Sequence, residues 1–244
     1  MSSPIADIWV YLAATPLLGL TLTLVCYQIA FAIHRRLGMH PAANPVLLAV
    51  AMLVAVLLAT DTPYPVYFDG AQFVHFLLGP ATVALAVPLH AQFGRLKKLA
   101  LPLLVALVAG SLAAALSAVA LGAMFGASRE LLMSLAPKSV TTPIAMGVAE
   151  RLGGLPSLTA VLVIATGILG AIGARYVYRA LHIEDPAVRG FAIGLASHGI
   201  GTARAFQVSE QTGAFAALAM GLNGLFTAAA LPSLLPWLES LFKP

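Results

Sequence analysis

Five stretches of the sequence carry no charged residue and are each long enough to cross a lipid bilayer as a helix. They cover residues 8–33, 41–60, 99–128, 152–174 and 211–238. An α-helix rises about 1.5 Å per residue, so roughly 20 apolar residues cross a hydrocarbon core of about 30 Å. The chain is 60% hydrophobic and only 9% charged, whereas about 25% of the residues of a soluble domain are charged. The sequence therefore predicts an all-α integral membrane protein.

Two further apolar stretches, near residues 70–93 and 187–209, are interrupted by polar residues. Basic residues follow several of the apolar runs, and basic residues are enriched on the cytoplasmic side of membrane proteins. This charge bias favours about seven transmembrane helices plus one re-entrant element over residues 131–155, with the N-terminus outside and the C-terminus inside. We expect one polytopic domain over residues 1–244, with weak repeats over about residues 1–128 and 129–244. The net charge of +4 then reflects topology, so we expect no nucleic-acid partner.

The stretch Pro137–Pro143 places a lysine and three hydroxyl groups inside apolar sequence. A lysine at membrane depth costs several kcal/mol, by roughly the insertion scales, unless it faces water, an anion or the protein interior. The two prolines also disfavour a continuous helix, and irregular backbone at that depth survives where it lines a cavity. We therefore predict that Lys138, Ser139, Thr141 and Thr142 form half of a binding site.

The second half is predicted in the stretch Ser197–Arg204. Gly199 and Gly201 weaken the helix there, and His198 and Arg204 are ionisable groups near membrane depth. A similar break, followed by a polar turn and a long apolar run, occurs at residues 79–94. Two such stretches in opposite directions indicate inverted repeats with two discontinuous crossing helices, which place a binding site near the bilayer midplane.

The predicted pocket is electropositive, because half-helix N-termini attract anions and Lys138 and Arg204 add positive charge. A small carboxylate anion suits it, held by a guanidinium group and by backbone N–H groups; charge alone does not exclude phosphate. The neutral donors are Ser139, Thr141, Thr142, Ser197 and Thr202, and the other expected lining residues are Pro80, Ala81, Thr82, His198 and Asn223. The candidates for coupling transport to an ion are His198, Glu210 and Glu150, since histidine changes charge near neutral pH.

Other interpretations of these residues stay open at the level of sequence. Lys138 can extend to the membrane interface without contacting a ligand. Arg204 can form a structural ion pair with Glu210 or Glu150. The threonine hydroxyls can bond to their own helix backbone, and His198 can be a packed, neutral imidazole.

Enzyme chemistry finds no support in the sequence. There is no Gly-x-Ser-x-Gly motif, no His-Glu-x-x-His motif and no phosphate-binding loop, and the single cysteine, Cys26, excludes an internal disulfide and a cysteine metal site. We predict no catalytic residues, no metal site and no cofactor.

Four long motifs carry a resemblance to a known family. They are residues 78–89 (LGPATVALAVPL), 137–146 (PKSVTTPIAM), 153–160 (GGLPSLTA) together with 166–171 (TGILGA), and 196–205 (ASHGIGTARA). In these motifs the chain resembles the LrgB/CidB family of bacterial inner-membrane proteins, to which the plastid glycolate/glycerate translocator of plants is related. Where Arg204 stands the family often has lysine, which keeps the charge and changes the hydrogen-bond geometry.

The resemblance implies two functions. One is secondary transport of small 2-hydroxy or 2-oxo acids such as glycolate, glycerate, lactate and pyruvate, by the alternating access of a bile-acid-transporter-like fold, of which an elevator movement is one form. The other is holin/antiholin-like regulation of murein hydrolase export and cell lysis. It also implies a bacterial inner-membrane location and a small LrgA/CidA-type membrane partner, and we expect a homodimer. The cationic residues Lys138 and Arg204 favour transport, because a lysis pore does not need them.

Overall fold

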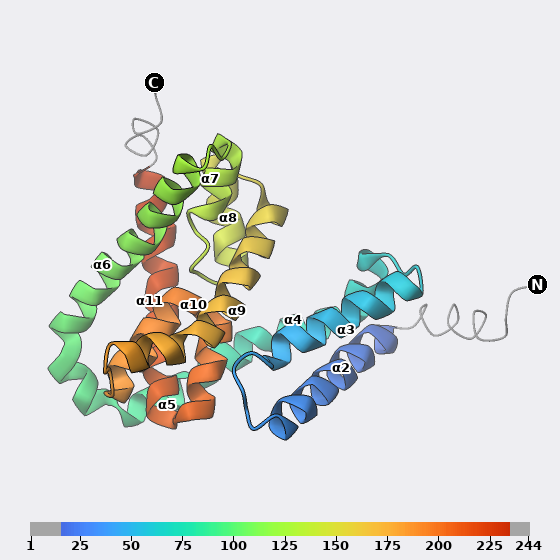
Figure 1. The fold of residues 1–244 in the computed structure, drawn as a ribbon, viewed down its shortest axis with the longest axis horizontal. Coiled ribbons are helices and arrows are strands. Elements are labelled where there is room, and N and C mark those ends of the chain that lie inside the picture. The colour runs from blue at the N-terminus through green and yellow to red at the C-terminus, as the bar shows by residue number, and fades with distance from the viewer. Residues whose placement is uncertain (1–15, 235–244) are drawn as a thin grey trace, which may run out of the picture. The chain divides into compact units, whose positions relative to one another are not determined.

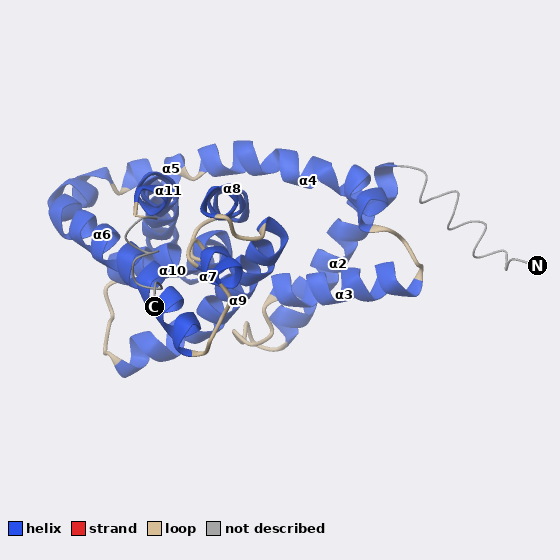
Figure 2. Ribbon diagram, turned by 90° about the horizontal axis from the view of Figure 1, so that it is seen from above, coloured by secondary structure: helices blue, strands red, loops and turns tan. Residues whose placement is uncertain are grey.

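The computed structural model describes residues 16–234, apart from the side chains of His75 and Leu78, and groups the chain into two compact units, residues 1–84 and 85–244. Every regular element within residues 16–234 is a helix (Figures 1 and 2). The expected start of the first span, residues 8–15, and the expected end of the last, residues 235–238, lie outside the described residues. The predicted all-helical class is therefore confirmed for the described chain.

The described part of the first unit, residues 16–84, contains three helices: α2 (Pro16–Arg36), α3 (Pro45–Ala59) and α4 (Tyr64–Ala84). Asn44 begins α3, because its side-chain oxygen accepts hydrogen bonds from the backbone N–H groups of the first turn at 2.9 and 3.2 Å. Helix α2 packs against both other helices, and the hydroxyl groups of Thr23 and Tyr67 lie 2.8 Å apart between α2 and α4.

The predicted interruption at Pro80–Thr82 is absent, since α4 continues through Pro80 to Ala84. A turn at Leu85 then separates α4 from the short helix α5 (Ala86–Ala91). Proline removes one backbone donor, and membrane helices tolerate that loss where local adjustments satisfy the freed carbonyl.

In the part of the chain that the structure describes, five helical segments are long and apolar enough to cross a membrane: Leu17–Arg36, Tyr64–Ala91, Phe93–Met124, Pro156–Ala180 and Glu210–Ser233. Helix α3 is apolar but has only 15 residues. The expected count of about seven spans is thus not reached among residues 16–234. Two predicted spans are not among the five: α3, which is short, and the stretch near residues 187–207, which is folded back on itself, as described below.

The second unit is built around two long helices, α6 (Phe93–Met124) and α11 (Glu210–Ser233). Two buried clusters lie along them. One joins Ala115 of α6 and Leu231 of α11 to the helices α7 (Arg129–Leu135) and α8 (Thr142–Leu152). The other joins Leu107 of α6 and Phe215 of α11 to α10 (Pro186–Val208). Helix α11 therefore runs from α10 at its beginning to α7 and α8 at its end, as Figure 1 shows.

Helices α7 and α8 form a first helical hairpin, which turns at residues 136–141. The chain that leaves α8 lies beside α7: the Ser134 hydroxyl of α7 accepts a 2.8 Å hydrogen bond from the backbone N–H of Leu155, just after α8. A Cβ atom on Gly154 would lie 2.7 Å from the backbone nitrogen of Ser134. The segment over residues 131–155 thus returns to the side where it starts, which is the shape that re-entry requires.

Helix α10 forms a second helical hairpin, with arms at residues 186–197 and 199–208. His198 between them has φ 42° and ψ −131°, which no helix contains. In a straight helix Ile193 and Ala205 would lie about 18 Å apart, yet they share one buried cluster. Gly201 lies against the Ile193 carbonyl, where a Cβ atom would come within 2.6 Å. Both ends of this stretch therefore lie on one side, and the prediction of a single span here is wrong.

Two glycines allow the second hairpin to pack closely on α11. A Cβ atom on Gly190 would collide with the Thr212 carbonyl, and one on Gly194 with the Ala216 carbonyl. Small residues let membrane helices approach in this way. A hairpin followed by a long helix thus occurs twice in this unit, once with α9 (Pro156–Ala180) and once with α11.

Ser134 supports a first prediction. Its buried hydroxyl donates to the Glu130 carbonyl at 2.7 Å and accepts from the Leu155 N–H. Replacing it with alanine leaves that N–H unpaired, so we expect Ser134→Ala to lower stability by about 1–3 kcal/mol. Thermal unfolding of the purified chain in detergent measures the change. Ser117→Ala is the matched control, because Ser117 is exposed on α6; an equal loss in both variants would contradict the prediction.

Candidate functional site

The tips of the two hairpins meet at one side chain, Asn223, in the middle of α11. The Asn223 Nδ2 atom donates to the Ser139 carbonyl in the first tip at 3.3 Å and to the Leu195 carbonyl beside the second tip at 2.9 Å. Its Oδ1 atom accepts from the hydroxyls of Ser111 at 2.6 Å and Thr227 at 3.1 Å. Asn223 is 1% exposed. This one amide therefore holds together two segments that are far apart in the sequence.

The turn at His198 is strained, because a non-glycine residue rarely adopts its backbone conformation. The His198 Nε2 atom lies 3.0 Å from the Val163 carbonyl of α9, and a carbonyl only accepts, so Nε2 carries the proton. The His198 carbonyl in turn accepts a 2.8 Å hydrogen bond from Thr202. These two bonds hold the turn in place. They agree with the packed, neutral imidazole considered above, in which Nδ1 carries no proton.

Helix α9 receives the second tip on two glycines. A Cβ atom on Gly167 would lie 2.7 Å from the His198 ring, and one on Gly170 would overlap the Ser197 hydroxyl. That hydroxyl is buried and has no hydrogen-bond partner among the described residues. The sequence interpretation missed Gly167, Gly170 and Ser111 as parts of the site. The spacing of the glycines was visible in the sequence, but such spacing is too common in membrane helices to indicate this packing site by itself.

The tips are electropositive, and backbone dipoles contribute to this. Thr141 is the N-cap of α8, but its side chain makes no capping hydrogen bond, so the N–H groups of the first turn are not satisfied by it. The second arm of the other hairpin also begins at its tip, after His198. Near the tips, the carbonyls of Ser139 and Leu195 are bound by Asn223, and the His198 carbonyl is bound by Thr202. Positive helix ends are therefore left facing the tips.

Lys138 adds a full charge beside these helix ends. It is partly buried, and its Nζ atom lies 3.4 Å from the Ser139 hydroxyl. Thr141 and Thr142 are also partly buried at the start of α8. An arrangement of one ammonium group, hydroxyl groups and helix N-termini can hold a small anion by charge and hydrogen bonds.

Arg204 does not lie at the hairpin tips. Its guanidinium group donates a 2.9 Å hydrogen bond from Nη1 to Gln207 Oε1 on the same arm, and it lines a pocket together with Arg175 of α9. It forms no ion pair with Glu150 or Glu210 in the described chain, so that interpretation of Arg204 is wrong. The position of Arg204 follows from the fold-back at His198, which places residue 204 toward the open end of the hairpin.

The remaining predicted residues are not part of the two tips. Glu150 is exposed near the end of α8, and Glu210 is exposed at the first position of α11. Pro80, Ala81 and Thr82 belong to the first unit, and their part in the site stays a prediction.

The fold defines a multi-pass helical membrane protein with two helical hairpins that converge on a buried asparagine. The LrgB-like family model matches residues 23–237, so the chain belongs to the LrgB-like family.

Proteins of two Bacillus species are similar to the chain over almost its whole length. It is 36% identical to the uncharacterized protein YwbG of Bacillus subtilis over 222 residues, which cover 91% of this chain and 98% of that protein. It is 28% identical to the antiholin-like protein LrgB of Bacillus cereus over 225 residues, which cover 92% and 97% of the two chains. No solved structure matches the chain significantly.

Proposed function

We propose that this protein is a secondary carrier for small monocarboxylate anions, the 2-hydroxy and 2-oxo acids glycolate, glycerate, lactate and pyruvate. The observation that carries the proposal is the meeting of two hairpin tips at Asn223, with Lys138 and positive helix ends around them. Interrupted helices that meet inside a membrane protein are a frequent way to bind an anion without opening a continuous pore.

In the proposed site the substrate carboxylate binds Lys138 and the first-turn N–H groups of α8. The hydroxyl or keto oxygen of the substrate takes hydrogen bonds from Ser139, Thr141 or Thr142, which lie beside that lysine in the sequence. The tips of the hairpins are hydrogen-bonded to α11 through the Asn223 amide, so alternating access requires movement of the tips with α11 or away from it. His198 is the proposed coupling group.

The proposed setting is a bacterial inner membrane, with the chain as a homodimer and with a small LrgA/CidA-type membrane protein as an additional partner. These assignments follow the family membership and are proposals for this chain.

A second candidate function is antiholin-like regulation of cell lysis, which the name of the Bacillus cereus relative favours. Such a regulator acts through contacts with other membrane proteins and does not need a buried cation beside helix N-termini. The first function explains Lys138, and the second does not.

Uptake into vesicles separates the two functions. The purified chain in proteoliposomes is expected to accumulate labelled glycolate or pyruvate, with saturation and with competition by the unlabelled acid, and to retain a trapped dye. Protein-free vesicles are the control. Dye leakage without saturable uptake would contradict the carrier and support the lysis-related function.

A further inference from the structure

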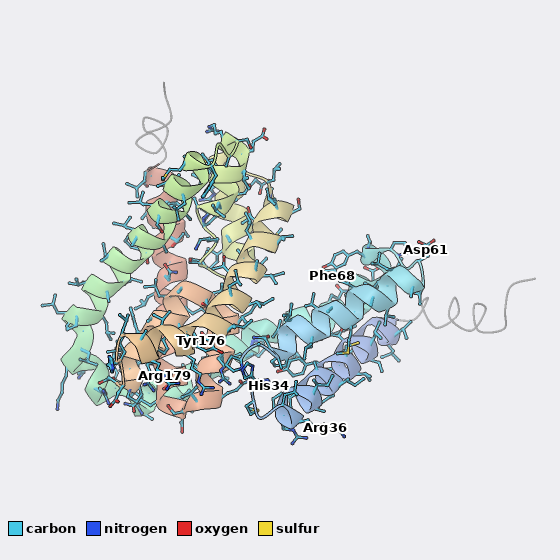
Figure 3. All side chains as sticks on the ribbon, viewed as in Figure 1. His34, Arg36, Asp61, Phe68, Tyr176 and Arg179 are labelled. Carbon is cyan, nitrogen blue, oxygen red and sulfur yellow. The ribbon has the colours of Figure 1, made fainter. Side chains whose placement is uncertain are left out.

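A pocket of about 630 Å³ lies where the end of α9 meets the open end of the second hairpin. Four arginines line it, Arg175 and Arg179 from α9 and Arg189 and Arg204 from α10, and we call it the arginine pocket. Figure 3 labels Arg179 on α9. In a straight helix residues 189 and 204 would be about 22 Å apart; the fold-back at His198 brings both to one pocket.

The charges of the arginine pocket are not balanced by protein groups. Glu184 is the one acidic residue among its lining residues, against four guanidinium groups. The nearby acidic residue Asp185 forms an ion pair with Arg95, and neither of these two residues lines the pocket. Anchoring at a membrane surface explains single basic residues, but it does not explain why four converge on one cavity.

Two of the four guanidinium groups are held in position. The Arg189 Nε atom donates to the Ile183 carbonyl at 2.6 Å, and its guanidinium carbon lies 6.0 Å from the centre of the Tyr178 ring. The Tyr178 hydroxyl donates to the Arg189 carbonyl at 2.7 Å. Arg204 is held by Gln207. Each guanidinium has five N–H groups, so most of these donors remain available to a ligand.

Size and charge together define the ligand. Pockets for small-molecule ligands are roughly 300–1,000 Å³, and the volume of the arginine pocket falls within that range. A monocarboxylic acid of two or three carbons would fill little of this volume and would balance only one of the positive charges. Ala171, Ile193 and Ala205 give it an apolar wall. Arginine binds phosphate with paired, parallel hydrogen bonds. We propose that the arginine pocket binds an anion with two or more phosphate charges, either a soluble organic phosphate or the headgroup of an anionic lipid.

The pocket is separate from the proposed carboxylate site. Arg175 lies eight residues beyond Gly167, the α9 residue that contacts the second tip, which is about 12 Å along the helix. Lys138 and Asn223 do not line it. The inference therefore goes beyond the proposed transport function and stands if that function fails.

Binding of pyrophosphate to the purified full chain tests the soluble source, measured by isothermal titration calorimetry. We expect one site per chain and at least a tenfold weaker affinity in the double variant Arg175→Gln/Arg179→Gln, whose two arginines are exposed. Arg151→Gln is the matched control, an exposed arginine of α8 outside the pocket. Citrate is the second probe and is expected to bind at least tenfold more weakly than pyrophosphate.

Native mass spectrometry of the chain from membranes that contain cardiolipin tests the lipid source. Retention of this diphosphate lipid by the unmodified chain, and its loss in the double variant, would support the proposal even if pyrophosphate does not bind. The proposal is overturned if neither pyrophosphate nor cardiolipin binds, or if the double variant binds them like the unmodified chain. It is also overturned if citrate binds as tightly as pyrophosphate.

Discussion

Replacing Asn223 with leucine is expected to lower the stability of the protein by about 3 kcal/mol or more and to release both hairpin tips. Leucine has a similar volume but no polar atoms, so the carbonyls of Ser139 and Leu195 lose their donor in a buried place. Each buried polar group left unsatisfied costs about 1–3 kcal/mol. Ser111 and Thr227 also lose their acceptor. Thermal unfolding in detergent measures the total loss.

Hydrogen–deuterium exchange locates the effect of Asn223→Leu. Faster exchange is expected in residues 136–141 and 195–199, and not in α2 or α3 of the first unit. Ser111→Ala is the matched control, because it removes one of the four hydrogen bonds and leaves both tip carbonyls bound; a loss of about 1 kcal/mol is expected, with exchange at the tips unchanged. Equal effects of the two variants would show that Asn223 does not connect the hairpins.

Hydrophobic patterning predicted the helices of this protein well, because length and apolarity alone decide whether a segment can lie in lipid. The irregular stretch at Pro137–Pro143 was also predicted, since its prolines and its lysine conflict with a continuous helix in lipid. In the resulting hairpin the chain after α8 returns to α7, where Leu155 donates a hydrogen bond to Ser134. In both cases the chemistry of neighbouring residues was sufficient to predict the local structure.

The fold-back of α10 was not predicted, and the position of Arg204 depended on it. Gly199 and Gly201 indicated a weak point, but the turn itself is at His198, where positive φ is unfavourable for the isolated residue. Contacts from other helices stabilise it, namely the Val163 carbonyl and the close approach of Gly167. Such contacts arise between residues about 30 positions apart, and no local pattern reveals them.

Asn223 is a second residue whose structural role the sequence does not reveal. In the apolar run over residues 211–238 the sequence has one asparagine, Asn223, and this is equally compatible with a lining residue and with a structural one. Its four partners come from α6, from both hairpins and from α11 itself. Once the amide binds the tip carbonyls, the positive helix ends and Lys138 remain for a ligand. The structural role of Asn223 thereby creates the electrostatics on which the proposed transport depends.

Replacing Lys138 with glutamine is expected to reduce uptake of glycolate and pyruvate by about 10–100-fold, because a hydrogen bond between charged groups contributes about 1.5–3 kcal/mol. Glutamine keeps the length and a donor but loses the charge. Lys138→Arg keeps the charge and is expected to retain more uptake than Lys138→Gln. Initial rates in proteoliposomes at several substrate concentrations separate a change in KM from a change in maximal rate, and we expect KM to rise.

Lys98→Gln is the control for Lys138→Gln, because Lys98 is an exposed lysine of α6 and its loss changes the net charge of the chain equally. Its uptake should match that of the unmodified protein. If Lys138→Gln also transports normally while the protein remains folded, the ammonium group reaches the membrane interface and does not contact the substrate. The positive helix ends at the tips would then have to bind the carboxylate alone, and the N–H groups after Thr141 would become the main determinant of anion binding.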